Sequence, residues 1–156
     1  MYRQTRWVLL TYRLPREPST PRISLWRQLR RLGVAQVADG VVALPMDART
    51  REQLEWLAEE VVEAGGEATI WFAEPGSAAH ERALAQQIAD AVKSEYEAVI
   101  AEANATTTSD AGRRRTLARL RRELRRIRSR DYFPSGIADR AVVAIERLTQ
   151  RSEVAS

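Results

Sequence analysis

The stretch that decides the fold spans residues 7–45 and reads WVLLTYRLPREPSTPRISLWRQLRRLGVAQVADGVVALP. It opens with a β-branched and aromatic run, residues 7–14, which predicts a strand at the centre of a sheet. Proline is well tolerated in the first turn of a helix, so Pro21 marks a helix start that Ser19 or Thr20 can cap. That helix is expected to run to Leu32, because a glycine follows it in the usual C-terminal position.

A hairpin completes this stretch. Asp39-Gly40 separates two apolar runs, 34–38 and 41–44, and such a dipeptide is a strong signal for a two-residue hairpin turn. Outward from it, Asp47 can cap a second helix that ends at the glycine pair 65–66, and residues 67–73 form a fourth strand. The order β-α-β-β-α-β predicts a ferredoxin-like α+β domain with two helices on one face of an antiparallel sheet.

The remaining chain predicts a helical extension. Apolar residues recur every three or four positions over 78–104, and leucine and isoleucine at 117, 120, 124 and 127 form a narrow apolar seam within the helix 113–130. A last helix is expected over 136–150. The predicted organisation is therefore a ferredoxin-like domain over 1–76, a helical extension over 77–151 and a frayed tail over 152–156.

The aromatic side chains are interpreted mainly as packing groups. All four tryptophans are predicted to face the core: Trp7, Trp26, Trp56 and Trp71. Tyr132 and Phe133 precede Pro134, and plugging a helix junction is favoured for them over stacking on nucleic acid.

Charge is strongly segregated along the chain. Residues 1–33 hold eight arginines and one acid, residues 34–106 hold four bases and fourteen acids, and residues 107–135 hold ten arginines and three acids. Two basic blocks thus flank an acidic middle, within a net charge of +4. This asymmetry indicates a polyanionic partner.

Composition excludes several kinds of chemistry. The chain has no cysteine and one histidine, His80, which rules out disulfides, thiolate zinc sites and a catalytic thiol. Residues 11–14, at the end of the predicted first strand, hold no carboxylate, which a magnesium-dependent nuclease site there would need. The only apolar run near the N-terminus, 7–12, is too short for a membrane span. We therefore expect a cytoplasmic protein that is not an enzyme, carries no metal and has no membrane partner.

Two stretches resemble a known family: residues 7–45, and LRRELRRIRSRDYF at residues 120–133 with the helix after it. Both are similar to the N-terminal domain of ChrB, the bacterial chromate resistance regulators. More distantly, the first half resembles the Cas2-like ferredoxin fold also seen in the phenylacetate repressor family. The resemblance implies a DNA-binding transcriptional regulator that responds to chromate and commonly continues into a second, C-terminal domain.

The first candidate site is an arginine cluster around the first helix. Guanidinium groups and unpaired helix N–H groups both favour phosphate or a tetrahedral oxyanion. The alternative is a solvated helix face that pairs with the acidic middle segment. The candidate double-stranded DNA contacts are Arg13, Arg16, Arg22, Arg27, Arg30 and Arg31.

Within that cluster, the start of the helix is a candidate anion site. Arg16 and Arg22 flank it, and Ser19 or Thr20 could add a hydroxyl. The expected ligand is a DNA phosphate, chromate or a sulfate-like oxyanion.

The arginine-rich helix supplies the second candidate site. One interpretation is a rail for the phosphate backbone, with Arg114, Arg115, Arg119, Arg122 and Arg126 as secondary contacts. The other is a helix pair in which these arginines meet acids of the long helix, namely Glu81, Glu95, Glu97 and Glu102. The two can coexist.

The function favoured is thus a DNA-binding regulator of chromate resistance genes that acts as a homodimer. The leading alternative is a protein-interaction or dimerisation module whose arginines are structural, and a nuclease comes third.

Overall fold

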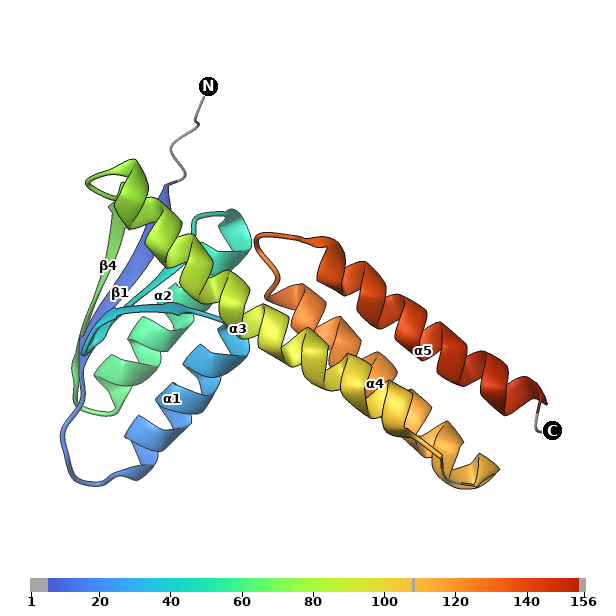
Figure 1. Ribbon diagram of the computed structural model, residues 1–156. Helices are drawn as coiled ribbons and strands as arrows, with labels where there is room; N and C mark the ends of the chain where they lie inside the picture. Colours follow the sequence, from blue (N-terminus) through green and yellow to red (C-terminus); the bar gives the residue numbers. More distant parts are fainter. Residues whose placement is uncertain (1–5, 108, 155–156) are drawn as a thin grey trace. The chain divides into compact units, whose positions relative to one another are not determined.

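The computed structural model describes residues 6–107 and 109–154, and its elements follow the predicted order (Figure 1). The α+β class and the helical extension are confirmed. The strands are β1 (Trp7–Arg13), β2 (Ala35–Ala38), β3 (Val41–Pro45) and β4 (Glu67–Ala73). The helices are α1 (Thr20–Leu32), α2 (Ala48–Glu63), α3 (Ala78–Ala105), α4 (Asp110–Ser129) and α5 (Gly136–Val154).

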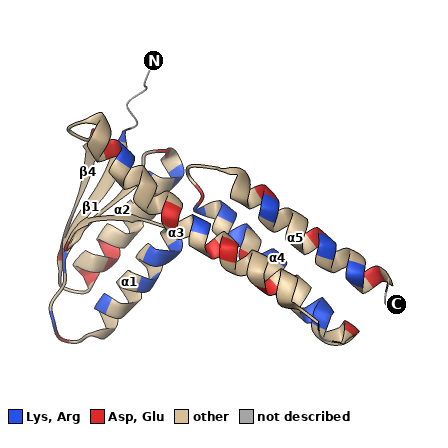
Figure 2. Cartoon of the chain, viewed as in Figure 1, with Lys and Arg blue, Asp and Glu red and all other residues tan. Residues whose placement is uncertain are grey.

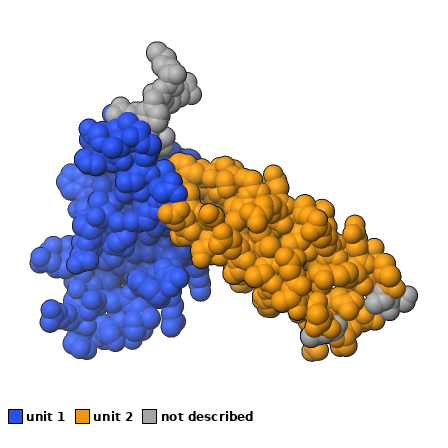
Figure 3. Space-filling view, in the orientation of Figure 1, with its two compact units in different colours: residues 1–88 blue, residues 89–156 orange. Residues whose placement is uncertain are grey.

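The chain divides into two compact units, residues 1–88 and 89–156 (Figure 3). The division falls inside α3, so the first turns of this helix belong to the sheet unit and the remainder to the helical unit. The last helix continues to Val154, beyond the expected end at residue 150. The end of the predicted frayed tail, 155–156, lies outside the described residues.

The sheet of the first unit has the strand order β2-β3-β1-β4, with every pair antiparallel. β1 is central, as its apolar sequence predicts. Figure 1 shows α1 and α2 on the same face of this sheet. Side chains alternate between faces, and Val8 and Leu10 pack under the helices together with Leu44, Leu54 and Leu57.

The first turns of α3 cover the opposite face of the sheet. Glu81 is buried there and accepts a hydrogen bond from Trp7 Nε1 at 3.5 Å. Gln87 reaches the outer edge of β2, where its Oε1 accepts from Gln36 N–H and its Nε2 donates to Gln36 O at 3.3 Å. The side-chain amide of Gln87 thus satisfies backbone groups that an edge strand otherwise leaves open.

Only one tryptophan meets the expectation of a core position. Trp7 is 1% exposed, whereas the exposed fractions of Trp26, Trp56 and Trp71 are 57%, 58% and 51%. The prediction was wrong for Trp26 and Trp56 because each lies beside the buried stripe of its helix, and for Trp71 because no residue of the edge strand β4 is buried. Leu25 and Leu29 define the inward face of α1, which places Trp26 about a quarter-turn away.

The second unit has its own core. Leu117, Leu120, Leu124 and Ile127 of the α4 seam are buried, as predicted, against side chains of α3 and α5. An apolar seam on an arginine-rich helix is also a reason to expect a homodimer. That reason fails, because the seam is covered within a single chain.

The helices α1 and α2 differ in how their first turns are capped. At α2, the Asp47 side chain accepts from Thr50 N–H at 2.7 Å, while Thr50 Oγ1 accepts from Asp47 N–H at 2.9 Å. This reciprocal pair is a capping box. At α1, Ser19 occupies the N-cap position but its side chain makes no capping hydrogen bond.

No helix within residues 6–107 or 109–154 is both long enough and apolar enough to cross a membrane.

Candidate nucleic-acid interface

A groove of about 990 Å³ lies in the first unit between α1, the end of β1 and the β2–β3 turn. Three of the predicted arginines line it, Arg13, Arg22 and Arg27, together with Ser19. The apolar part of its wall comes from Leu14, Ile23, Leu25 and Trp26. The groove therefore combines several guanidinium groups with a broad apolar surface.

Strand pairing brings the hairpin turn to this groove. Tyr12 N–H donates to Gly40 O at 2.8 Å, which ties the turn to the last residues of β1. Gly40 has a φ of 71°, and a Cβ atom there would lie 2.6 Å from the Tyr12 carbonyl oxygen. Glycine is required at this position for both reasons, and its neighbour Asp39 is thereby held at the groove wall.

Electrostatics at this wall are mixed. Burial raises the pKa of Tyr12, the negative charge of Asp39 raises it further, and the positive charge of Arg22 opposes them. The charges of Asp39 and Arg22 thus both affect the pKa of Tyr12, which lines the groove. An anion entering the groove would meet Arg22 as its attractive group and Asp39 as its repulsive one.

A smaller hollow of about 380 Å³ lies on another side of α1. Thr20, Arg27 and Arg31 line it, with Ile23, Ser24 and Gln28. Arg30 instead lies over the ring of Trp26, with its Cζ atom 4.8 Å from the ring centroid. The exposed Trp26 thus holds Arg30 by a cation–π contact.

The predicted residues are only partly brought together. Arg22 and Ser19 share the groove, Thr20 lies in the smaller hollow, and Arg16 lines neither. The four residues proposed for the anion site therefore do not form one pocket.

The six arginines of the first cluster have no carboxylate partner in the part of the chain that the structure describes. All six side chains are exposed, and none forms an ion pair with any residue in the described ranges 6–107 and 109–154. α1 itself contains no acidic residue. The alternative of pairing with the acidic middle segment finds no support here.

The arginines of α4 differ. Arg119 pairs with Glu102 and Arg126 with Glu123, the latter at 3.6 Å. Figure 2 shows basic residues along both α1 and α4, with acidic residues interspersed on α3. Arg114, Arg115 and Arg122 are exposed, with no ion pair to another described residue. The helix-pair interpretation is thus confirmed for Arg119, whereas the phosphate contacts of Arg114, Arg115 and Arg122 stay a prediction.

Two of the four acids expected to meet this helix have other described partners. Glu81 lies in the first unit, where it bonds Trp7, and Glu97 pairs with Lys93 of its own helix at 4.0 Å. Glu95 and Glu102 do meet arginines, because they lie on the part of α3 that packs in the second unit.

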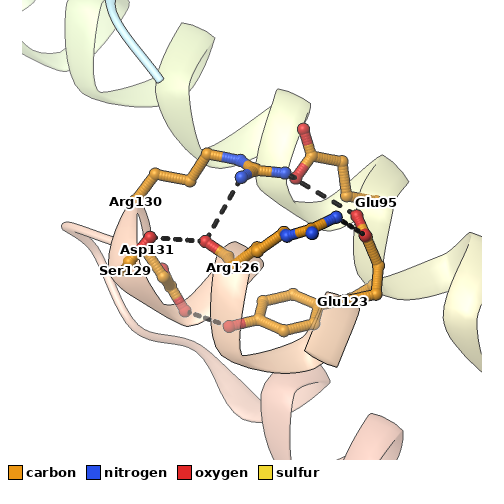
Figure 4. Close-up of polar contacts among 7 residues, drawn as sticks. Glu95, Glu123, Arg126, Ser129, Arg130 and Asp131 are labelled. Carbon is orange, nitrogen blue, oxygen red and sulfur yellow. Dashed lines mark hydrogen bonds and ion pairs between the residues drawn. The ribbon is translucent and has the colours of Figure 1, made fainter. Parts of the chain in front are cut away.

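Two consecutive residues of the segment RSRDYF, Arg130 and Asp131, connect the end of α4 to α3 (Figure 4). Arg130 donates through Nε and Nη2 to the same oxygen of Glu95, at 2.9 and 2.5 Å. Asp131 accepts from the Tyr96 hydroxyl at 2.9 Å. Burial and this hydrogen bond raise the pKa of Tyr96 above its ordinary value.

Sequence reasoning missed Tyr12, Gln36, Asp39 and Trp26 as groove residues. Asp39 was identified only as a turn residue, although pairing the predicted strands in antiparallel register would have placed the turn beside the end of β1. The sequence did not indicate Trp26 as a groove residue, because its hydrophobicity predicts a core position.

Residues 22–111 match the family described as "Protein ChrB, N-terminal". The chain belongs to this ChrB family. The match begins within α1 and includes Arg22, Arg27, Arg30 and Arg31, so most of the arginine cluster lies in the part that defines the family.

A curated relative, Protein ChrB of Cupriavidus metallidurans, is 29% identical over 143 residues. The alignment covers 88% of this chain and 44% of the relative, so the chain spans less than half of that protein's length. No solved structure matches the chain.

Proposed function

We propose that this chain is the DNA-contacting part of a cytoplasmic transcriptional regulator of the ChrB type, without enzymatic activity. The observation that carries the proposal is the set of exposed arginines around α1 that lack acidic partners among the described residues. Guanidinium groups left without carboxylates are available to phosphate, and their planar donors match its geometry.

The arrangement suits contact with a phosphate backbone better than binding of a small ligand alone. Arg27 lines both hollows, and Arg22 and Arg31 extend the basic surface to either side of it. Contacts of this kind supply sequence-independent affinity and position a protein on duplex DNA. Arg114, Arg115 and Arg122 are proposed as secondary contacts.

The resemblance to chromate resistance regulators suggests chromate as the effector of the proposed regulator. Chromate is a tetrahedral dianion, and Arg22 with Ser19 offers a guanidinium and a hydroxyl in one groove. We propose that chromate competes with a DNA phosphate for Arg22, so that the effector weakens DNA binding.

Salt dependence tests the DNA contact. The affinity for a labelled duplex should fall as salt rises, with log K against log [salt] having a slope of about −0.9 per phosphate contact. Arg27→Ala combined with Arg31→Ala should weaken binding to every DNA sequence. The slope should become less steep by the amount expected for about two phosphate contacts. The measurement is fluorescence anisotropy at several salt concentrations.

The matched control removes two exposed arginines from α5, Arg140→Ala with Arg147→Ala. It makes the same change in net charge and should leave most of the slope intact. An affinity that is insensitive to salt, or equal losses in both double variants, would refute the proposal and favour a protein-interaction module.

A further inference from the structure

The two edges of the sheet differ in how they are protected. The edge strand β2 is short, has an irregular register between Gln36 and Ala38, and has its backbone bonded by Gln87. The other edge strand, β4, pairs with β1 over seven residues without irregularity. Its sequence, EATIWFA, contains no lysine, proline or glycine, the residues that usually discourage strand addition.

Within the described residues, β4 pairs only with β1, so its outer backbone N–H and C=O groups form an open row. The strand is also apolar, and Trp71 and Phe72 are 51% and 43% exposed. An open, flat and apolar edge is a template for another strand.

We propose that β4 is the homodimer interface, and that two copies of this chain pair their β4 strands antiparallel about a two-fold axis at Ile70. In that register Thr69 of one copy lies opposite Trp71 of the second, and Ala68 lies opposite Phe72. Aromatic residues paired across strands with β-branched ones are favourable contacts.

A hollow next to the strand fits this register. Ala68 lines a depression of about 370 Å³ together with Ala58, Val62, Glu59 and Glu63 of α2. Phe72 lies on the same face of the sheet, since Arg51 of α2 covers its ring at 4.7 Å. Because Phe72 lies opposite Ala68 of the second copy, its ring reaches the depression there, and the symmetry repeats the contact.

Charge is complementary in the same arrangement. Arg51 accompanies the Phe72 ring, and the rim of the receiving depression carries Glu59 and Glu63. Within one chain Arg51 pairs with Glu55 at 2.9 Å on an exposed surface, an arrangement that contributes little to stability. The depression opposite Phe72 and the opposite charges around it therefore both favour a second copy as the occupant.

Sedimentation of the intact chain tests the pairing. The wild type should sediment as a dimer of the 17.7 kDa chain. Val62→Lys places a charge in the depression and should raise the dissociation constant at least about tenfold. Trp56→Lys is the matched control, because Trp56 is equally exposed on the same helix but belongs to the outward face. It should leave the dimer intact, and circular dichroism should show both variants folded.

A cysteine reporter tests the register. The chain has no cysteine, so a single substitution gives a clean signal. Ile70→Cys should cross-link two copies, because residue 70 lies opposite itself across the axis. Val143→Cys, exposed on α5, should not. A wild type that is only monomeric, a dimer unaffected by Val62→Lys, or equal cross-linking at both positions overturns the proposal. No DNA is used, so the result is independent of the proposed function.

Discussion

Arg22 and Arg130 carry the same charge in different surroundings. The Arg22 side chain is exposed in a groove and has no carboxylate partner among the described residues, whereas the Arg130 side chain is 13% exposed and binds Glu95. Removing a partly buried, paired arginine leaves its acid without a partner, so the expected cost is to folding. Removing an exposed, unpaired one changes mainly what the surface attracts.

The first prediction at this scale concerns Arg22. Sulfate has the shape and charge of chromate, so either anion should raise the apparent dissociation constant for DNA in proportion to its concentration. Arg22→Ala should weaken DNA binding and remove both effects, because the guanidinium shared by anion and phosphate is gone. Anisotropy titrations at constant ionic strength measure this. Unchanged DNA affinity for Arg22→Ala at low salt would contradict the shared site, and Arg140→Ala serves as the control.

A second prediction concerns Tyr96, whose pKa is raised by burial and by its hydrogen bond to Asp131. The folded state holds the phenolic proton more tightly than the unfolded state does. The resulting stability is complete below the ordinary tyrosine pKa of about 10 and declines as pH rises above it.

Urea unfolding between neutral pH and pH values above about 10 checks this behaviour of Tyr96. The free energy of unfolding should fall over the alkaline part of the range in the wild type. Tyr96→Phe should be less stable at neutral pH and should show a smaller alkaline decline, because the contribution of Tyr96 is gone while that of Tyr12 stays. A decline of equal size in both proteins would assign the effect to other groups.

At the scale of elements, the start of α2 depends on a single buried threonine. Thr50 Oγ1 donates to Pro45 O at 2.7 Å and accepts from Asp47 N–H, so one hydroxyl joins β3 to the helix cap. Thr50→Val keeps the shape but leaves both backbone groups without this partner. The expected loss is about 1–3 kcal/mol, measured by chemical denaturation. Glu52→Ala, exposed in the same turn, should change stability by less than about 0.5 kcal/mol.

The elements that the sequence predicted well are those in which local chemistry and packing agree. Asp39-Gly40 and the Asp47 cap lie where turn and cap preferences placed them, since these signals act over a few residues. The tryptophans at 26, 56 and 71 were misplaced because size and hydrophobicity do not tell which side of a helix or strand is covered. The groove was not predictable from periodicity, because it needs residues from β1, α1 and the hairpin together.

At the scale of the whole molecule, the two basic blocks of the sequence differ in whether their arginines are paired with acids. A small part of the acidic middle lies in the second unit, where Glu95 and Glu102 bind arginines that follow them in the chain. The first basic block keeps its charge, because no carboxylate of the described residues pairs with it. Net charge alone could not distinguish these cases, since both blocks carry the same excess.

The Gln87 amide at the edge of β2 determines how far strand pairing can go. In the proposed pairing, a sheet with one open edge adds one copy, and the edges that remain are the two β2 strands, each bonded by Gln87. A fragment ending at residue 76 would lack Gln87 and present an open strand at each side of its sheet. Each added copy would then offer a fresh edge to the next, so growth would have no natural end and would run toward a fibre. In the pairing proposed for β4, the Gln87 side chain therefore acts together with the short, irregular β2 strand to limit the assembly to two copies.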